Sequence, residues 1–342
     1  MTSAHTHLPI PTFDEIIERS HVVALPMAIR FRGVTTREAL LIEGPAGWGE
    51  FSPFLEYEPA EAATWLRSGI EAAWQGFPTP LREKIEVNAT IPAVPAAQVP
   101  EVLQRFPGCR TIKVKVAEPG HTLADDVARV NAVRENLPNA IIRVDANRGW
   151  TVSEALEAAR ALAPLDYLEQ PCATVEELAE VRTQLMRAGI FMRVAADESI
   201  RRSDDPYRVA ELHAADVAIV KVAPLGGVRR VLELADYLRA RHMDITVASA
   251  LDTAVGLNAG LAAVAALPLI DDDDLIDVAP AAAGLATSQL FKEDIAEPRP
   301  VIDGFLPTAP INPDPARLEE FAADAATTNH WHERLRACLN LL

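Results

Sequence analysis

The chain contains little cysteine, and its three cysteines lie far apart, at Cys109, Cys172 and Cys338. No Cys-x-x-Cys pair occurs, and the spacing is not that of a disulfide framework. Both a disulfide-stabilised scaffold and a zinc knuckle are therefore disfavoured, and a reducing compartment fits best. We expect the protein to be cytoplasmic.

Long apolar runs and excess positive charge are also missing. The longest apolar stretch, residues 255–270, is interrupted by Asn258 and Pro268 and predicts a buried helix rather than a membrane span. Residues 1–7 lack the basic-then-apolar order of a signal peptide. The net charge of −17 disfavours a nucleic acid or an anionic membrane as a partner. A small anionic substrate is not excluded, because a bound cation would invert the local field.

Short β-rich runs alternate with helical patterns from about residue 84 to residue 280. The runs start 23 to 30 residues apart and cover 84–91, 111–117, 141–148, 166–171, 193–199, 216–223, 244–251 and 273–280. The intervening segments 123–137, 153–163, 175–188, 227–240 and 255–267 predict helices, and in the first of them apolar residues recur at helical spacing. This alternation predicts βαβ units and a parallel sheet.

Eight such units fit an α/β barrel of the TIM type, which takes roughly 200–250 residues. An open doubly wound sheet is the alternative, and the absence of a Gly-x-Gly-x-x-Gly turn favours the barrel. Residues 1–83 break the rhythm and predict a small α+β domain. Residues 84–280 form the predicted barrel. Residues 281–342 form a proline-rich tail with a helix-like segment at 315–326, which we expect to pack back on the first domain.

Three acidic residues, Asp145, Glu169 and Asp197, lie late in three consecutive strand-like runs. Barrel active sites lie at the carboxyl ends of strands, and neighbouring strands are about 4.8 Å apart, so these carboxylates can converge on one ion. An oxygen site with open positions suits Mg²⁺, and no histidine lies in a strand run to favour zinc. One such acid alone could merely cap a helix. Three in register are costly to bury unless they are paired or bind metal.

Lysines lie on the strands before and after these acids. Lys113 and Lys115 are two residues apart and share a face of their strand, and Lys221 lies in the apolar run of the sixth strand. If they face inward, Lys115 and Lys221 oppose each other across the acids, an arrangement suited to moving a proton next to a carboxylate. The alternatives are that Lys113 and Lys115 face outward, and that Lys221 forms a structural ion pair with Asp197 or Glu198.

Other residues give weaker indications of a role in substrate binding or in support of the acids. Gly226 lies in a Gly-Gly pair that opens a helix, where backbone amides can bind an anion or form only a tight turn. Ser249, near the end of the seventh strand, could donate to a substrate carboxylate or serve as a core or cap hydroxyl. Asn147 shares a face with Asp145 and could support it or simply form a turn. The acidic run 271–274 precedes or opens the eighth strand, and we expect a solvated turn there.

With the residues in this arrangement, the chain resembles the muconate-lactonizing subgroup of the enolase superfamily. The resemblance rests on five motifs: Lys113-Val-Lys115, Asp145-Ala-Asn147, Glu169-Gln-Pro171, Asp197-Glu198-Ser199 and Asp216-x-x-x-x-Lys221. Residues 31–33 and 47–54 are similar to the capping domain of that superfamily. Together with residues 249–256, they look most like the branch of the subgroup that forms o-succinylbenzoate.

The resemblance implies a modified (β/α)7β barrel under an α+β capping domain formed by the N-terminal segment and the C-terminal tail. It implies Mg²⁺, with Mn²⁺ as a substitute, held by Asp145, Glu169 and Asp197. The implied reaction is the syn loss of water from 2-succinyl-6-hydroxy-2,4-cyclohexadiene-1-carboxylate, which gives o-succinylbenzoate for menaquinone synthesis. The implied partner is a small dicarboxylate, with no nucleic acid or membrane, and a monomer is compatible with this function.

The same resemblance implies roles for individual residues. Lys115 would take the proton next to the ring carboxylate and return it to the departing hydroxyl. Lys221 would stabilise the enediolate from the other side of the ring. The remaining expected site residues are Lys113, Ser249 and Gly226 for substrate binding, and Asn147 and Glu198 in support of the metal ligands.

Two other activities stay open. Racemisation of N-succinylamino acids, or a related epimerisation, would use the same lysines to exchange protons on opposite faces. Related dipeptide epimerases carry an Asp-x-Asp at the end of the eighth strand, and the run 273–280 has none there. This argues against dipeptide substrates and leaves N-acyl amino acids open. A Schiff-base aldolase on Lys221 or Lys115 would need no metal and would leave the three acids unexplained.

Overall fold

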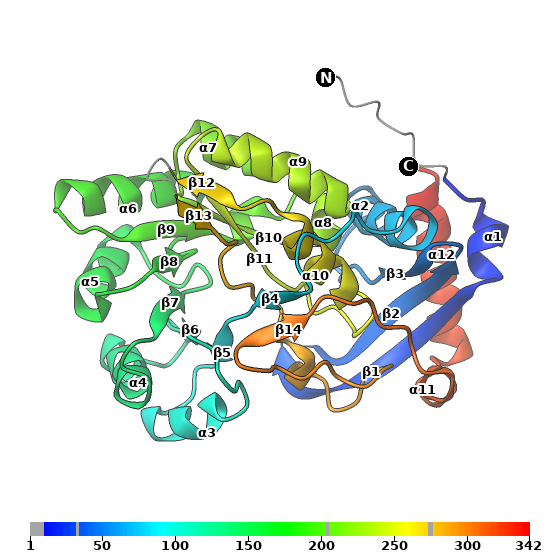
Figure 1. The fold of residues 1–342 in the computed structure, drawn as a ribbon, viewed down its shortest axis with the longest axis horizontal. Helices are drawn as coiled ribbons and strands as arrows, with labels where there is room; N and C mark the ends of the chain where they lie inside the picture. Colours follow the sequence, from blue (N-terminus) through cyan, green and yellow to red (C-terminus); the bar gives the residue numbers. More distant parts are fainter. Residues whose placement is uncertain (1–9, 32–33, 203–204, 273–275) are drawn as a thin grey trace.

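The computed structural model describes residues 10–31, 34–202, 205–272 and 276–342. In that part of the chain, a seven-stranded parallel sheet curls into a barrel, at the left of Figure 1, and a second domain packs at one end of it. The strands follow one another around the barrel in sequence order: β5 (Ala89–Ile91), β6 (Thr111–Lys115), β7 (Ile141–Asp145), β8 (Tyr167–Glu169), β9 (Arg193–Ala196), β10 (Val217–Val220) and β11 (Asp244–Val247). The predicted barrel is confirmed, and the doubly wound alternative is wrong.

Helices cover the outside of the barrel, and the sequence specifies where several of them begin. Thr122, Thr151 and Thr174 each form a capping box with the acidic residue three positions later, which satisfies the first backbone amides of the helix. The covering elements are η2 (Ala96–Gln98), α3 (Val99–Leu103), α4 (Leu123–Asn136), α5 (Val152–Leu162), α6 (Val175–Arg187), α7 (Asp205–Glu211), α9 (Val228–Arg239) and α10 (Leu257–Ala266). Two short helices, η3 (Glu198–Ile200) and α8 (Val222–Leu225), lie instead in the connections just after β9 and β10.

The barrel closes through a segment that the sequence analysis placed too early. Ala283 bridges in parallel to Val87, and Gly284 bridges in parallel to Ala248, so these two residues occupy the eighth strand position. Of the predicted strand 273–280, residues 273–275 lie outside the described residues. The part that follows them, β13 (Ile276–Val278), pairs antiparallel with β12 (Ile270–Asp272) in a hairpin. A short run of small residues fits the closing position because a Cβ on Gly284 would come within 3.2 Å of Ala248 Cβ.

The predicted first strand, 84–91, is also two strands. β4 (Lys84–Glu86) pairs antiparallel with β14 (Phe305–Pro307) from the C-terminal part of the chain, and only β5 joins the parallel sheet. The amide of Asn88 donates to the carbonyl of Ala283 at 2.9 Å, so the chain passes from one pairing to the other at the closing segment.

The second domain caps the carboxyl ends of the barrel strands, and its antiparallel sheet lies at the right of Figure 1. Phe51, Trp65 and Leu66 lie in its buried core, which also takes in Leu251 and Val255 from the chain after β11. Its N-terminal elements are α1 (Phe13–Ile17), β1 (Ser20–Phe31), β2 (Val34–Gly44), β3 (Gly47–Phe51), α2 (Pro59–Ile70) and the π-helix η1 (Glu71–Gln75).

The C-terminal tail packs against this capping domain, next to β1 and β2 in Figure 1. Trp331 packs edge-on against Phe51, with ring centroids 5.7 Å apart. The helix expected at 315–326 is interrupted, because the amide of Ala323 donates to Val22 of β1 at 2.9 Å and leaves the helical pattern. The tail therefore forms η4 (Ser288–Leu290), β14, α11 (Pro315–Glu320) and α12 (Ala325–Leu339). The domain boundaries after residues 83 and 280 stay predictions.

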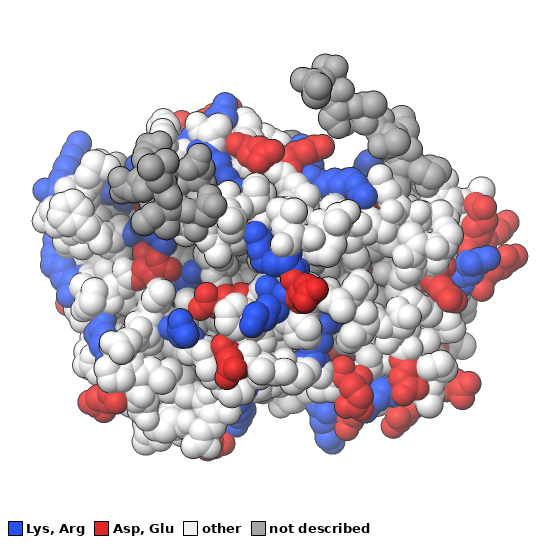
Figure 2. All heavy atoms as spheres, viewed as in Figure 1, with Lys and Arg blue, Asp and Glu red and all other residues white. Residues whose placement is uncertain are grey.

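On the face in Figure 2, acidic and basic side chains lie mostly in mixed groups separated by uncharged surface. The net charge of −17 is therefore not gathered into a single acidic field on that face. No helix in the described part of the chain is long and apolar enough to cross a membrane.

A buried carboxylate fixes the capping domain to the barrel. Glu50 of β3 accepts hydrogen bonds from the backbone amides of Thr253, at 3.2 Å, and Gly256, at 3.0 Å, just before α10. Arg37 of β2 donates to the carbonyl of Leu251 at 2.9 Å. Burial, with a smaller contribution from Asp252, raises the pKa of Glu50 to about 7, although Arg37 opposes the shift.

This shift predicts how stability depends on pH. A carboxyl group with a higher pKa in the folded chain than in the unfolded chain stabilises the fold when protonated, and that contribution is lost as the pH rises through about 7. Relative to a Glu50→Gln variant, the wild type should therefore gain about 2 kcal/mol of unfolding free energy between pH 8 and pH 5.5. Urea denaturation of both proteins at the two pH values measures this. A difference that stays constant would contradict the assignment.

Candidate active site

Three buried carboxylates lie together where adjacent barrel strands end. Asp145 and Glu169 are the last residues of β7 and β8 and are register partners, and Asp197 directly follows β9. Their exposed fractions are 1% for Asp145, 0% for Glu169 and 6% for Asp197. The sequence analysis predicted that these acids lie at neighbouring strand ends, and the parallel register places them there.

Lysines face these carboxylates from both sides of the barrel. Lys113 Nζ donates to Asp145 Oδ2 at 3.0 Å and to Glu169 Oε1 at 2.9 Å, and Lys115 Nζ donates to Asp145 Oδ2 at 2.5 Å. Lys221 follows β10, four strands away from β6, and pairs with Asp197. The alternative in which Lys113 and Lys115 face outward is wrong. The ion pair of Lys221 with Asp197 was one of the expected alternatives.

Burial and charge set different proton affinities for the acids. Burial raises the pKa of Glu169 to about 7, and the nearby charge of Asp145 adds to the shift. Burial would also raise the pKa of Asp145, but Lys113 and Lys115 outweigh it and hold this pKa well below its usual range. For Asp197, Lys221 and Arg201 likewise outweigh burial, and the pKa is lowered.

The pKa values of Lys113 and Lys221 are shifted in opposite directions. For Lys113, burial is outweighed by Asp145 and Glu169, and the pKa rises well above its ordinary value. For Lys221, burial prevails over the attraction of Asp197, and its pKa is lowered. Lys113 is therefore held as a cation among the acids, whereas Lys221 gives up a proton more easily than an ordinary lysine.

The donor set fits a hard divalent cation. Glu169 Oε1 is held by Lys113, but Glu169 Oε2 is buried without a hydrogen-bond partner, an expensive state for a carboxylate oxygen. Oxygen ligands of this kind are those that Mg²⁺ prefers. The side chains are not gathered around a single point, since no cluster of three His, Cys, Asp or Glu side chains suited to a metal occurs in the described residues. Lysines instead contact one oxygen of each acid, Asp145 Oδ2, Glu169 Oε1 and Asp197 Oδ1.

A second layer of polar residues surrounds this centre. Asn147 Oδ1 accepts from Lys115 Nζ at 2.7 Å, and Asn147 Nδ2 donates to Glu198 Oε1 at 3.2 Å. The same Glu198 oxygen accepts from Arg201 at 3.0 Å. Asn147 and Glu198 were expected to support the metal ligands, and the structure places them next to Lys115 and Asp197. Arg201 was missed, although its position four residues after Asp197 is a helical spacing.

Gln170 is a further residue that the sequence analysis did not single out. Its side chain is fully buried, and Gln170 Oε1 accepts from the amide of Asp197 at 3.0 Å and from that of Ser199 at 3.2 Å. It therefore fixes the backbone that carries Asp197 relative to β8. Its place directly after Glu169 was the available indication.

Two expected substrate-binding residues have partners within the chain. Ser249 Oγ donates to Asp252 Oδ2 at 2.9 Å, so its hydrogen is already used in the turn after β11. The helix N-terminus next to Gly226 binds the carboxylate of Glu71, which accepts from the amides of Val228 and Arg229 at 2.7 and 3.1 Å. Substrate contacts at Ser249 and Gly226 stay predictions.

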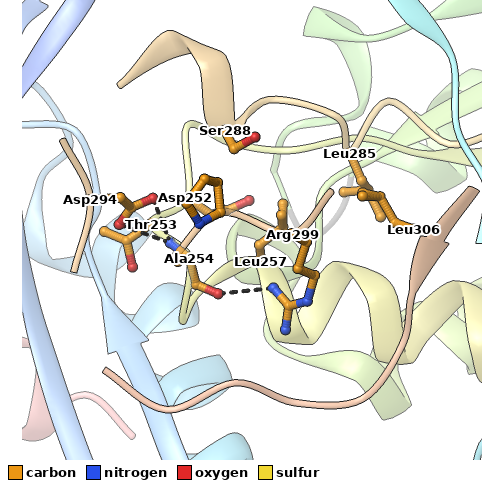
Figure 3. A pocket seen from close by; sticks show the side chains of 10 residues that line it. Asp252, Thr253, Ala254, Leu257, Leu285, Ser288, Asp294, Arg299 and Leu306 are labelled. Carbon is orange, nitrogen blue, oxygen red and sulfur yellow. Dashed lines mark hydrogen bonds between the residues drawn. The ribbon is translucent and has the colours of Figure 1, made fainter. Parts of the chain in front are cut away.

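The turn after β11, which Glu50 of the capping domain contacts, is also held by Asp294 and Arg299 of the C-terminal segment. Figure 3 shows the Asp294 carboxylate and the Arg299 guanidinium meeting the backbone of Ala254. Asp294 accepts from the amide at 3.1 Å, and Arg299 donates to the carbonyl at 3.2 Å. With Glu50 on the capping side, these contacts give the turn a fixed position at the mouth of the barrel.

Comparison with known proteins gives a consistent result for both domains. Residues 96–312 match the family described as enolase C-terminal domain-like, and residues 22–73 match that described as enolase N-terminal domain-like. The chain is 55% identical to o-succinylbenzoate synthase of Mycolicibacterium smegmatis over 97% of this chain and 99% of that protein. It is 53% identical to o-succinylbenzoate synthase of Mycobacterium tuberculosis over 97% of both.

Solved structures share the fold. Muconate lactonizing enzyme from Pseudomonas fluorescens, complexed with muconolactone, superimposes with a TM-score of 0.71 at 24% sequence identity, covering 89% of this chain and 98% of that one. A putative sugar isomerase from Streptomyces coelicolor gives a TM-score of 0.70 at 20% identity, covering 91% and 96%. At sequence identities this low, the structural similarity shows the fold alone, which is a barrel with a capping domain.

The raised pKa of Glu169 predicts how metal affinity depends on pH. A cation bound by this carboxylate must displace its proton, so binding weakens as the pH falls below about 7. We expect Mg²⁺ to bind about tenfold more weakly at pH 6 than at pH 8, with proton release. Isothermal titration in buffers of different ionisation enthalpy measures both quantities. In a Glu169→Gln variant the affinity should be low at both pH values; equal wild-type affinities at pH 6 and 8 would contradict the prediction.

Proposed function

This chain belongs to the o-succinylbenzoate synthase family of the enolase superfamily, and from that premise we propose that it acts as a hydro-lyase on 2-succinyl-6-hydroxy-2,4-cyclohexadiene-1-carboxylate. The product is o-succinylbenzoate, which serves menaquinone synthesis. The identity of 53–55% to synthases over 97% of the chain supports this reaction. The structural observation that carries it is the position of Lys115 and Lys221 on opposite strands with three buried carboxylates at the same end of the barrel.

Divalent metal use is general in the enolase superfamily, where Mg²⁺ accompanies a lysine or histidine base. In this chain Asp145, Glu169 and Asp197 would hold Mg²⁺, or Mn²⁺ in its place. The unpartnered Glu169 Oε2 and the purely carboxylate donor set support this assignment. The bound cation would offset the negative charge that develops on the substrate carboxylate when the adjacent proton leaves.

Lys115 supplies the base. Asp145 and Asn147 hold its Nζ at 2.5 and 2.7 Å, which restricts the position of the amine without a mobile element. In its neutral form, the amine takes the proton next to the ring carboxylate. The bond from the ring to the hydroxyl oxygen then breaks, and the same amine protonates the departing hydroxyl to give water. The ring becomes aromatic, which makes the second step undemanding and lets one lysine serve both.

Lys221 supplies positive charge from the other side of the ring. Its ammonium, paired with Asp197, would stabilise the enediolate that forms when Lys115 takes the proton. The side chains of Lys221 and Asp197 are only 14% and 8% exposed, and a charge interaction is stronger where little water reaches it. Lys113, which bridges Asp145 and Glu169, keeps these two acids in place and would approach the substrate carboxylate from the same strand as the base.

A second activity, racemisation of N-succinylamino acids, uses the same first step. The observation that favours it is that a second lysine, Lys221, lies across the barrel from Lys115. Burial also lowers the pKa of Lys221, which favours proton exchange. Racemisation needs both lysines to exchange protons, whereas dehydration needs Lys221 only as a charge. An assay with each substrate, with and without Mg²⁺, decides which activities the chain has.

These roles predict different results for two substitutions. Lys115→Ala should lower the dehydration rate at least about a thousandfold because it removes the only base for both steps, while Mg²⁺ still binds. Lys221→Arg should keep more dehydration activity than Lys221→Ala, because the guanidinium retains the positive charge. The same variant should abolish proton exchange on the substrate face that Lys221 approaches. The measurements are steady-state dehydration and exchange of the substrate α-proton with deuterium from the solvent.

Two results would contradict these roles. Dehydration near the wild-type rate in Lys115→Ala would show that another group is the base. Deuterium exchange on both faces in Lys221→Arg would show that Lys221 does not exchange protons. Mg²⁺ titration of each variant is the control that separates lost chemistry from a lost metal site.

A further inference from the structure

Arg129 of α4 is a buried cation beside the end of β6, the strand that carries Lys115. Its exposed fraction is 1%, and so is that of Asp126, one turn earlier on the same helix. Arg129 Nη1 pairs with Asp126 Oδ1 at 2.8 Å. A buried ion pair loses hydration that further hydrogen bonds must replace. The partners of these two side chains therefore indicate what the pair holds in place.

The Arg129 guanidinium joins the chain after β5 to the end of β6. Nε donates to the carbonyl of Val94 at 2.7 Å, and Nη1 donates to the carbonyl of Lys115 at 2.8 Å. Strand β5 ends at Ile91, the register partner of Val114, so the parallel ladder on this side stops before it reaches Lys115. The carbonyl of Lys115 therefore takes its donor from a helix side chain and not from the neighbouring strand.

The acid of the pair holds the next part of the same backbone. Asp126 Oδ2 accepts from the amide of Ala117 at 3.0 Å. Ala117 has a φ of 58°, a left-handed conformation that residues other than glycine adopt rarely and at a cost. Arg129 and Asp126, which we call the β6 clamp, thus hold the chain on both sides of the point where it leaves the strand that ends at Lys115.

The β6 clamp acts on a different part of Lys115 than the contacts within the site. Asp145 Oδ2 and Asn147 Oδ1 hold the amine at 2.5 and 2.7 Å, and both contacts use its hydrogens. The stem of a lysine is flexible, so these contacts alone do not fix the backbone from which it extends. The β6 clamp fixes that backbone whether the amine is protonated or neutral.

We propose that Arg129, paired with Asp126, is a positioning residue for the base, because it sets the place from which β6 presents the Lys115 amine. This rests on the proposed function, since it assumes that Lys115 takes the proton. Arginine suits the role because its planar fork directs its donors at fixed angles. Besides the two carbonyls, the fork reaches His121, whose Nδ1 lies 2.9 Å from Nη2. A lysine here would keep the charge beside Asp126 but could not reach all three partners.

The same helix offers a matched control. Arg134 of α4 donates from Nη2 to the carbonyls of Leu162, at 2.5 Å, and Pro164, at 3.0 Å. Leu162 is the last residue of α5, so Arg134 ties α4 to the neighbouring helix and not to β6. Arg129→Lys and Arg134→Lys therefore change the same kind of contact on one helix, but only Arg129→Lys changes it at the strand that carries the base.

The test compares the two variants as Mg²⁺-loaded enzymes, by steady-state dehydration, Mg²⁺ titration and amide hydrogen exchange of residues 114–118. In Arg129→Lys we expect kcat to fall at least about tenfold, because a displacement on the order of 1 Å can cost about a hundredfold in rate. KM and the Mg²⁺ affinity should stay close to those of the wild type, while residues 114–118 exchange faster. Arg134→Lys should match the wild type in kcat and in this exchange. Asp126→Asn, which leaves one side-chain oxygen where the β6 clamp uses two, is the second variant if Arg129→Lys does not fold.

The proposal is overturned if kcat of Arg129→Lys stays near the wild-type value, or if Arg134→Lys lowers kcat equally. A fall in kcat that is matched by weaker Mg²⁺ binding, or that leaves the exchange of residues 114–118 unchanged, also overturns it. A wild-type chain that does not dehydrate the cyclohexadiene substrate overturns the proposed function alone. The effect of the β6 clamp is then read as deuterium exchange into an N-succinylamino acid, which Arg129→Lys should slow on the face of Lys115 and not on that of Lys221.

Discussion

The charge balance among buried carboxylates and lysines is the constraint on which the rest of this structure depends. Asp145, Glu169 and Asp197 are removed from water at the ends of adjacent strands, and each needs positive charge nearby to stay ionised. In the structure described here, Lys113, Lys115 and Lys221 supply it. The same groups that make burial tolerable are those that proton transfer requires, so stability and reactivity are properties of one cluster.

The capping domain depends on the barrel in a similar way. Its carboxylates bind backbone amides where barrel helices begin: Glu71 at the start of α9 and Glu50 before α10. α9 follows β10, which is followed by Lys221, and α10 follows β11, the next strand of the barrel. The capping domain is therefore connected to the barrel through buried hydrogen bonds.

Much of the barrel and its centre could be predicted because strand period and spacing are local properties of the sequence. Alternating runs located the seven parallel strands, although the first run also included the antiparallel β4, and strand-end positions gave Asp145, Glu169 and Lys115. The eighth position could not be predicted, since Ala283 and Gly284 pair only because Val87 and Ala248 already stand on either side. Gln170 was missed for a related reason: its partners Asp197 and Ser199 follow the next strand, and only the folded chain brings them together. Arg201 differs, since its partners Asp197 and Glu198 are four and three positions away.

The central claim is that the three acids hold one divalent cation between the two lysines. A crystal structure of the protein grown with Mn²⁺ tests it directly, because anomalous scattering locates the ion without ambiguity. The account predicts one strong anomalous peak within coordination distance of oxygens from Asp145, Glu169 and Asp197, with Lys115 and Lys221 on opposite sides. Data that show no peak there at saturating Mn²⁺, or a peak bound by other residues, would contradict the account.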